Sequence, residues 1–324
     1  MLERIKRGIC YIIIILLLPY ILTVFLNGSS ITTYSHVDGT FIKVRPEQNE
    51  RQKEKSHKES SLDDAADGKD AAVDNKESEV IEMSIEDYCI GVMARSIPAT
   101  YKEEALKAQA VAVRSLTYRK IKQSEGTCVF EGGYWTDKQM EDIWGMKYAV
   151  YHHKLEKAWN DTEGQVLYYG EDVALTPYFR LSNGSTRDAK EVLGSEDYPY
   201  LKMVECPLDL ESKEELKTRI FDELKAEVKK TDSAGYVLSV QAGEEQVNGE
   251  EFRNAYDLDS ACFTLQDYNG KLRVTTRGVG HGLGMSQYTA NRMAKEGKDY
   301  KEILDYFFSG TEIKEVTEIL KTTE

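Results

Sequence analysis

The chain has 324 residues, of which 41 % are hydrophobic and 30 % charged, with only 6 prolines. This composition excludes a collagen-like, a disulfide-dense or a wholly disordered chain. The 42 Lys and Arg residues against 56 Asp and Glu residues give a formal net charge of −14, and no basic stripe interrupts this acidic background. Because binding to a phosphate backbone needs clustered basic side chains, the charge excludes a nucleic-acid partner.

An apolar run near the N-terminus predicts how the chain meets a membrane. Residues 9–26 read ICYIIIILLLPYILTVFL and carry no charge. At about 1.5 Å per residue, a helix of this length reaches about 27 Å, enough to cross a bilayer core. Basic residues precede the run but do not follow it, which predicts a cytoplasmic tip at residues 1–8 and a transmembrane signal anchor at 9–26. The alternative is a signal peptide cleaved at residues 27–30. Either way, the rest of the chain is expected outside the cytoplasm.

A polar segment follows the apolar run. Residues 46–80 contain no aromatic residue, eleven acidic residues and six basic ones. Such a segment buries too little apolar surface to offset the entropy lost when it becomes ordered. We therefore predict a flexible acidic tether over residues 27–80 and a single folded domain over residues 81–318.

Within that domain, hydrophobic periodicity and breakers predict the elements in chain order. After Pro98, a capping box from Thr100 to Glu103 introduces an alanine-rich helix, Tyr101–Lys120, whose two apolar stripes predict a central position. Strands are predicted at Gln165–Tyr169, Leu175–Leu181, Tyr200–Val204, Val237–Gln241 and Leu272–Thr276. Further helices are predicted at Asp209–Lys230, Ser286–Glu296 and Tyr300–Phe308. Strands that are segregated from helices in this way predict an α+β domain.

Four cysteines lie after the apolar run: Cys89, Cys128, Cys206 and Cys262. They allow two disulfides in any of three connectivities, or buried free thiols, which we favour. No CxxC pair and no Cys/His spacing of the zinc type occurs in the sequence.

A glycine-rich segment carries the strongest functional signal. Residues 277–290 read RGVGHGLGMSQYTA, with four glycines alternating around His281 between a predicted strand and a predicted helix. The spacing matches neither a dinucleotide fingerprint nor a P-loop. His281 is either a proton-transfer or hydrogen-bonding group that lines a cleft, or a structural histidine held at a strand-to-helix turn. The residues alone leave both interpretations open.

Four blocks of the sequence resemble one family. The segment GVGHGLGMSQ resembles the C-terminal hallmark of the stage II sporulation protein D family, which includes amidase-enhancer domain proteins of bacterial cell walls. Three further blocks, found in the family's order, also resemble it: IEDYCIGVMARSIPATYKEEALKAQAVAVRSLTYRK, PYFRLSNGSTRDAKEVLGSEDYPYLKMVEC and VNGEEFRNAYDLDSACFTL. The resemblance covers residues 80–315.

The resemblance implies a lytic transglycosylase that cleaves glycan strands from which a partner amidase has removed the stem peptides. The family's acid is the Glu of a block close to GVVAAEMPA, which here reads GVMARSIPA over Gly91–Ala99, so that Ser96 occupies the acid's position. A serine hydroxyl does not titrate near neutral pH, and losing a general acid typically lowers the rate by about 10²–10⁴. The remaining candidates for a catalytic role are His281 and Glu104.

The resemblance also implies a zinc ion in clostridial members of the family, held by cysteines and a histidine just after the alanine-rich helix. Here that stretch reads SEGTCVFEGGYWTDKQM and keeps only Cys128. A single thiol is not a structural zinc site. We therefore predict no metal and no other cofactor.

The sequence thus predicts a membrane-anchored, extracytoplasmic protein that engages peptidoglycan glycan strands at the septum between mother cell and forespore. Its cleaving activity is expected to be reduced or lost. The alternatives are an active enzyme that uses another acid, and a glycan-binding scaffold or amidase enhancer. Expected partners are a sporulation amidase and membrane sporulation proteins. The residues predicted to bind the glycan are Gln109, Arg114, Ser182, Gly184, Thr186, His281, Ser286 and Gln287.

Overall fold

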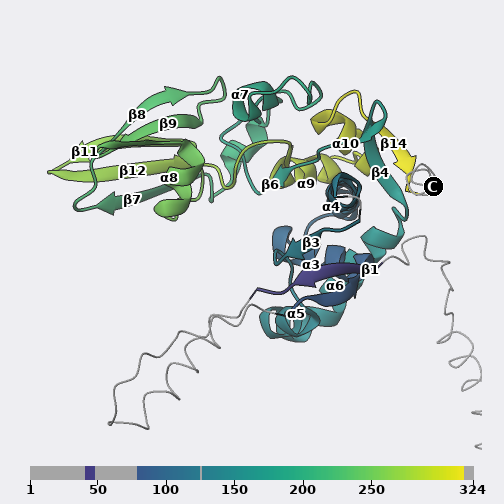
Figure 1. Cartoon of the computed structure of the whole chain (residues 1–324). Coiled ribbons are helices and arrows are strands. Elements are labelled where there is room, and N and C mark those ends of the chain that lie inside the picture. The colour runs from purple at the N-terminus through teal and green to yellow at the C-terminus, as the bar shows by residue number, and fades with distance from the viewer. Residues whose placement is uncertain (1–40, 48–78, 125, 317–324) are drawn as a thin grey trace, which may run out of the picture. The chain divides into compact units, whose positions relative to one another are not determined.

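The computed structural model of the chain describes residues 41–47, 79–124 and 126–316, all of which belong to one compact unit (Figure 1). The predicted anchor at residues 9–26 and most of the predicted tether lie outside these residues. Within the described part, no helix is both long and apolar enough to span a bilayer. The anchor therefore stays a prediction.

Helix α4 (Glu103–Gln123) is buried on two faces, as its two apolar stripes predict. One stripe, with Leu106, Ala110 and Val113, packs into the first hydrophobic core. The other, with Ala105, Ala108 and Ala112, packs into the second core. Alanines allow neighbouring backbones to approach closely, so α4 contacts strand β4 (Gln165–Tyr169) and helices on several sides.

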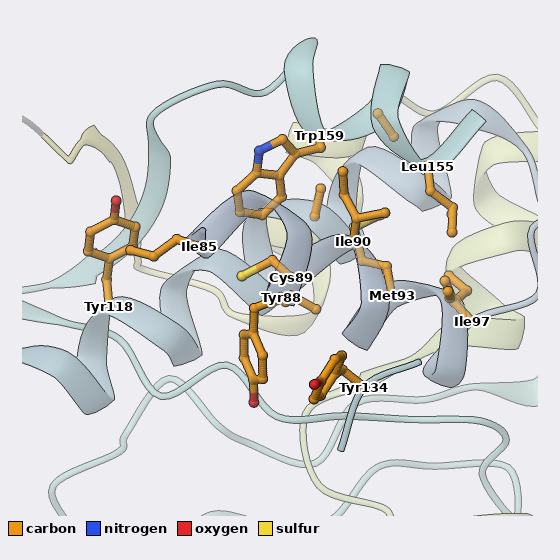
Figure 2. Close-up of a cluster of buried hydrophobic side chains, with 14 of the residues drawn as sticks. Ile85, Tyr88, Cys89, Ile90, Met93, Ile97, Tyr118, Tyr134, Leu155 and Trp159 are labelled. Carbon is orange, nitrogen blue, oxygen red and sulfur yellow. The ribbon is translucent and has the colours of Figure 1, made fainter. Parts of the chain in front are cut away.

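The first core lies between α4, α3 (Ile85–Ser96) and α6 (Tyr148–Asn160). Ser84 caps α3 by accepting a hydrogen bond from the backbone N–H of Asp87 at 3.0 Å. Helix α5 (Asp137–Trp144), capped by Thr136, and the 3-10 turn η1 (Gly145–Lys147) precede α6. Figure 2 shows the inward side chains of this core, among them Ile85, Tyr88, Cys89, Ile90, Met93, Leu155 and Trp159.

The predicted start of the central helix is wrong by two residues. Helix α4 begins at Glu103, and Thr100 does not cap it. Instead, the side chain of Asn291, from helix α9 (Gln287–Lys295), accepts a hydrogen bond from the backbone N–H of Lys102 at 2.9 Å. The start of α4 therefore has no side-chain cap, and its contact at Lys102 comes from a residue distant in sequence, which a local pattern cannot reveal.

Part of the predicted tether is a strand. Residues Phe41–Arg45 form β1, which pairs antiparallel with β2 (Ile81–Ser84) and parallel with β3 (Val129–Glu131). The side chains of Ile42 and Val44 enter the first core. The folded domain therefore includes residues 41–45, and the boundary predicted at residue 81 is wrong, because the short FIKVR run alternates as a strand.

Around the second core, β4 pairs with β14 (Glu312–Glu315) and β5 (Asp172–Val173), and β6 (Tyr178–Phe179) pairs parallel with β13 (Met285–Ser286). Helices α9 and α10 (Tyr300–Phe307) complete this core and confirm the two predicted C-terminal helices. Residues 200–204 form no strand, although Ser185 and Glu205 make an isolated bridge. The short helix α7 (Ala189–Leu193) lies in the sequence between the two residues of this bridge.

The predicted helix Asp209–Lys230 is wrong. Its place is taken by the 3-10 helix η2 (Pro207–Glu211) and strands β7 (Leu216–Phe221) and β8 (Ala226–Thr231). A spacing of four also fits a strand, whose side chains alternate with period two, so the pattern did not distinguish the two structures. Strand β7 pairs with β12 (Lys271–Arg277) over six positions, and this pairing determines its conformation.

Two three-stranded sheets enclose the third core. One has the order β11-β12-β7, with β11 (Phe263–Tyr268), and the other has the order β10-β9-β8, with β9 (Val237–Ala242) and β10 (Glu245–Val247). Helix α8 (Gly249–Ala255) packs on β9 through Phe252. Strands β4, β9 and β12 confirm three of the predicted strands. The described residues thus form a mixed α+β structure, and Cys89, Cys128, Cys206 and Cys262 are free thiols.

Arg114 ties α4 to the turn after α6. Its guanidinium donates to the carbonyls of Trp159 at 2.9 Å and Thr162 at 2.8 Å, and it lies 3.6 Å from the centre of a Trp159 ring. The side chain is fully buried. It therefore donates hydrogen bonds to buried backbone carbonyls, and its role is structural.

We expect Arg114→Met to destabilise the chain by about 3 kcal/mol, because it leaves the buried carbonyls of Trp159 and Thr162 without their donor. Denaturant unfolding of the purified chain measures this loss. The matched control is Arg219→Met, which removes an exposed ion pair to Asp257 and should cost less than about 1 kcal/mol. Equal losses in the two variants would contradict the structural role of Arg114.

Candidate functional site

Three residues predicted from the sequence form one hydrogen-bonded chain. Ser96 is the last residue of α3, Gln109 lies on α4 and Gln287 is the first residue of α9. The Gln109 amide nitrogen donates to the Ser96 hydroxyl at 3.4 Å. The Gln287 amide nitrogen in turn donates to the Gln109 amide oxygen at 3.2 Å. The hallmark segment is thus joined to the position that the family resemblance gives to the acid.

The groups that contact the Ser96 hydroxyl carry no charge. Tyr178 lies beside Ser96; burial raises the pKa of Tyr178 to about 12, while Ser96 acts in the opposite direction, so that the phenol stays protonated at neutral pH. Gln109 and Gln287 are buried, and the amide oxygen of Gln287 has no hydrogen-bond partner among the described residues. None of these side chains can release a proton near neutral pH.

The two glutamates that follow Ser96 in the sequence are engaged in contacts elsewhere. The Glu104 carboxylate accepts from the backbone N–H of Tyr300 at 2.9 Å and pairs with Lys107 at 3.1 Å. Glu103 pairs with Lys157 and Lys107, and the hydrogen bond from Lys157 is the main reason that its pKa lies below the ordinary value. Both carboxylates are therefore engaged in ion pairs, and the Glu104 carboxylate also accepts a hydrogen bond at the first residue of α10.

The backbone holds one ring nitrogen of His281. Its Nδ1 accepts a hydrogen bond from the backbone N–H of Leu283 at 3.2 Å, and the ring packs against Phe179 of β6, with the ring centres 5.7 Å apart. Burial lowers the pKa of the ring, while the charge of Glu250 acts in the opposite direction. This geometry favours the structural interpretation, because His281 fastens the glycine-rich loop to β6 and is not part of the Ser96 chain.

Arg187 secures the same loop from its other side. Its buried guanidinium donates to Asp232 at 2.6 Å, to Glu250 at 2.9 Å and to the backbone carbonyl of His281 at 3.0 Å. Gly284 has φ of +82°, and a Cβ at this position would collide with the carbonyl of Pro177. The glycine thus allows β13 to lie beside β6.

A buried carboxylate that the sequence reasoning missed connects the middle block to the hallmark. Asp209 accepts hydrogen bonds from the backbone N–H of Ser182 at 2.7 Å, from the Ser286 hydroxyl at 2.7 Å and from the Thr289 hydroxyl at 2.6 Å. Desolvation raises its pKa, and the hydrogen bonds only partly oppose that rise. The available signal was a single acid among apolar neighbours in CPLDL, which the prediction of a helix from residue 209 obscured.

The remaining predicted binding residues serve the local fold. Thr186 donates to the Lys202 carbonyl at 3.1 Å and accepts from the backbone N–H of Val204 at 2.8 Å. The Gly184 carbonyl accepts from the backbone N–H of Cys206 at 2.7 Å. The Ser182 backbone N–H and the Ser286 hydroxyl both donate to Asp209. The Arg114 guanidinium donates to a backbone carbonyl in the turn after α6. Among the described residues, no group of three or more His, Cys, Asp or Glu side chains is placed to hold a metal ion.

Comparisons with known proteins identify the family. The sequence profile of the family described as stage II sporulation protein (SpoIID) matches residues 73–169, which include Ser96 and Gln109. Stage II sporulation protein D of Bacillus subtilis (strain 168) is 33 % identical over 266 residues, which cover 74 % of this chain and 77 % of that protein. The chain belongs to the stage II sporulation protein D family.

Two further relatives extend the comparison. Stage II sporulation protein D of Bacillus amyloliquefaciens is 32 % identical over the same shares of the two chains. The amidase enhancer of Bacillus subtilis (strain 168) is 26 % identical over 290 residues, which cover 68 % of this chain and 39 % of that protein. The predicted resemblance to the stage II sporulation protein D family is therefore confirmed.

Asp209 should make stability depend on pH in a defined direction. Because burial raises the carboxyl's pKa in the folded chain above the ordinary 3.8, the folded state keeps its proton to higher pH than the unfolded state does. The stability that Asp209 contributes is therefore greatest below the ordinary pKa and is lost as the pH rises through the pKa of the folded chain.

The variant Asp209→Asn cannot titrate, so the difference in melting temperature, unmodified chain minus variant, should decrease as the pH rises above the ordinary pKa of 3.8. The exposed Asp257→Asn is the matched control. An increase of the difference with pH would show that the surrounding donors stabilise the ionised carboxylate more than burial destabilises it.

Proposed function

We propose that this chain is a membrane-anchored, peptidoglycan-engaging protein of endospore formation whose glycan-cleaving activity is reduced or lost. It acts on the septal wall during engulfment and contacts glycan strands through the site around Ser96. The body lies outside the cytoplasm and residues 9–26 hold it at the membrane. Family membership supports the sporulation role, and the amidase-enhancer relative supports a link to wall amidases.

One observation carries the proposal. At the position where the family resemblance places the catalytic Glu, the Ser96 hydroxyl contacts an amide, a phenol and the carbonyl of Met93. A lytic transglycosylase needs an acid that protonates the glycosidic oxygen and then takes a proton back while the sugar closes on its own hydroxyl. The described side chains around Ser96 bind and orient polar groups, but they do not supply that proton.

The first alternative is an active enzyme with a different acid. Glu250 is the carboxylate that acts electrostatically on His281, but its two oxygens accept hydrogen bonds from Arg187 at 2.9 Å and Arg253 at 3.0 Å. Asp209 is enclosed by hydroxyl and amide donors and is fully buried. Neither carboxyl projects to the Ser96 hydroxyl, so this alternative is less favoured.

The second alternative is a scaffold that binds glycan or enhances an amidase. It is favoured by the preserved chain from Ser96 through Gln109 to Gln287, which keeps hydrogen-bonding groups directed at one place. Sugars are recognised by such polar groups in a preformed site. In this alternative, binding alone is the function, and the chain needs no glycan cleavage.

Restoring the acid tests the proposal. We expect the unmodified full chain in detergent to release little or no anhydro-sugar from glycan strands without stem peptides. The variant Ser96→Glu should raise the rate by about 10²–10⁴, because a half-buried carboxyl beside the Gln109 amide regains the proton donor. Chromatography of the released sugars measures the product.

The matched control is Ser96→Gln, which has nearly the same size as Ser96→Glu but cannot titrate and should stay inactive. Anhydro-sugar release by the unmodified chain at a rate similar to Ser96→Glu would contradict lost activity and favour another acid. Tight glycan binding without product in all three proteins would favour the scaffold.

A further inference from the structure

A groove lies at the C-terminal end of α4, away from Ser96. Its middle part has a volume of about 390 Å³ and is lined mainly by Arg119, Tyr169, Asp172, Tyr198 and Tyr200. Hollows of about 230 Å³ and about 270 Å³ adjoin it, the first sharing Arg119 and Asp172 with the middle part and the second sharing Tyr198. We call these three parts the tyrosine groove. Three hollows that share lining residues suit a linear polymer better than a compact ligand.

The floor of the tyrosine groove is aromatic and rigid. The rings of Tyr169 and Tyr200 lie 4.8 Å apart, and Tyr198 meets Tyr200 edge to face at 6.4 Å. The Tyr200 hydroxyl accepts a hydrogen bond from the backbone N–H of Leu175 at 2.7 Å, which fixes this buried ring. Tyr169 remains 39 % exposed. Flat rings that are held in place and partly exposed offer stacking surfaces for the apolar faces of sugar rings.

Two cations at the groove make no ion pair among the described residues, although Arg119 acts electrostatically on Asp172. The Arg119 guanidinium donates to the Val173 carbonyl at 2.5 Å and to the Tyr198 hydroxyl at 3.4 Å. Among the described residues, no carboxylate lies within ion-pair distance of Arg119 or of Lys202, whereas Lys122 is paired with Asp172 at 2.8 Å. In a chain with a net charge of −14, such unpaired cations indicate a ligand that carries its own carboxylates.

Acidic side chains in the same groove restrict the ligand further. Asp172 and Asp197 line the middle part, and Glu196 lines an adjoining hollow. A densely charged polyanion would be repelled by them, whereas sugar hydroxyls would find hydrogen-bond acceptors. The ligand therefore combines many hydroxyls with carboxylates that are spaced apart.

One extended segment connects the groove to Ser96. The segment starts at Val173, beside Arg119, is held to α4 by the hydrogen bond from Thr176 to the Ala112 carbonyl at 2.8 Å, and ends at Tyr178, which contacts Ser96. Five residue steps of at most about 3.6 Å limit its length to about 18 Å. A single oligosaccharide can span this distance.

We propose that the tyrosine groove is a second glycan site, which binds an acidic linear glycan with sugar faces on Tyr169 and Tyr198 and carboxylates near Arg119 and Lys202. The inference rests on the proposed function and specifies its ligand. A peptide-free strand of alternating N-acetylglucosamine and N-acetylmuramic acid has the required chemistry, because every second sugar bears a free lactyl carboxylate. The groove would hold the strand at a distance from Ser96.

Calorimetric titration of the full chain in detergent tests this site. The probe is a peptide-free tetrasaccharide of N-acetylglucosamine and N-acetylmuramic acid, and chitotetraose is the comparison of equal length without carboxylates. We expect the acidic probe to bind about tenfold more tightly. Tyr198→Ala, Lys202→Gln and Arg119→Gln should each weaken its binding by about fivefold to tenfold.

The control Lys138→Gln makes the same change of charge on an exposed side chain of α5 and should bind as the unmodified chain does. Lys202→Gln also alters an exposed residue, so the test does not depend on whether Arg119→Gln folds. If the acidic probe binds and the groove variants match the control, the groove inference is wrong while the proposed function stands. If the unmodified chain binds neither probe, both are wrong.

Discussion

Burial of α4 on two faces is the constraint on which the rest of the structure depends. Because packed neighbours cover this helix, each polar side chain on it must find its partner within the protein. Arg114 takes the carbonyls of Trp159 and Thr162, and Ser115 accepts from the backbone N–H of Leu167 at 2.9 Å. Gln109 donates a hydrogen bond to Ser96 and accepts one from Gln287. The helix thus determines where the end of α3, strand β4 and the start of α9 lie.

The Ser96 site follows from the same constraint. A buried amide on α4 needs both a donor and an acceptor, and Ser96 and Gln287 supply them from two elements that are far apart in sequence. These hydrogen bonds preserve the shape of the site whether or not it carries an acid. In the proposed function, a serine at the position of the acid leaves the site without a proton donor while the supporting side chains keep their hydrogen bonds. A binding role can survive such a replacement, because binding needs shape and hydrogen bonds but no titrating group.

Local patterns predicted the elements whose conformation depends on local sequence. The two stripes of α4, the strands β4, β9 and β12, and the helices α9 and α10 all have strong periodicity. The errors lie where distant contacts decide the outcome. Leu216 and Ile220 fit either a helix or a strand, and pairing with β12 selects the strand. Asn291 accepts from the backbone N–H of Lys102 just before α4, and strand β1 needs partners from two later segments.

The same distinction applies to the functional residues. Motif matching located Ser96, Gln109 and Gln287, which the structure brings together. It also selected Arg114, Gly184 and Thr186, whose polar atoms serve the fold. A motif records that a residue type is required but not whether a ligand or the protein requires it. Asp209 was missed because its partners come from three separate segments, and only the folded chain brings them together.

Asp209 also shows why a suitable pKa does not make a catalytic acid. Its carboxyl has the raised pKa that a general acid needs, and it sits directly beneath the start of α9. However, hydroxyl and amide donors from Ser182, Ser286 and Thr289 enclose it, and it has no exposed surface. A proton donor must come within hydrogen-bond distance of the glycosidic oxygen. To reach a glycan, Asp209 would have to break the contacts that join the middle block to the hallmark, and so dismantle the site it would serve.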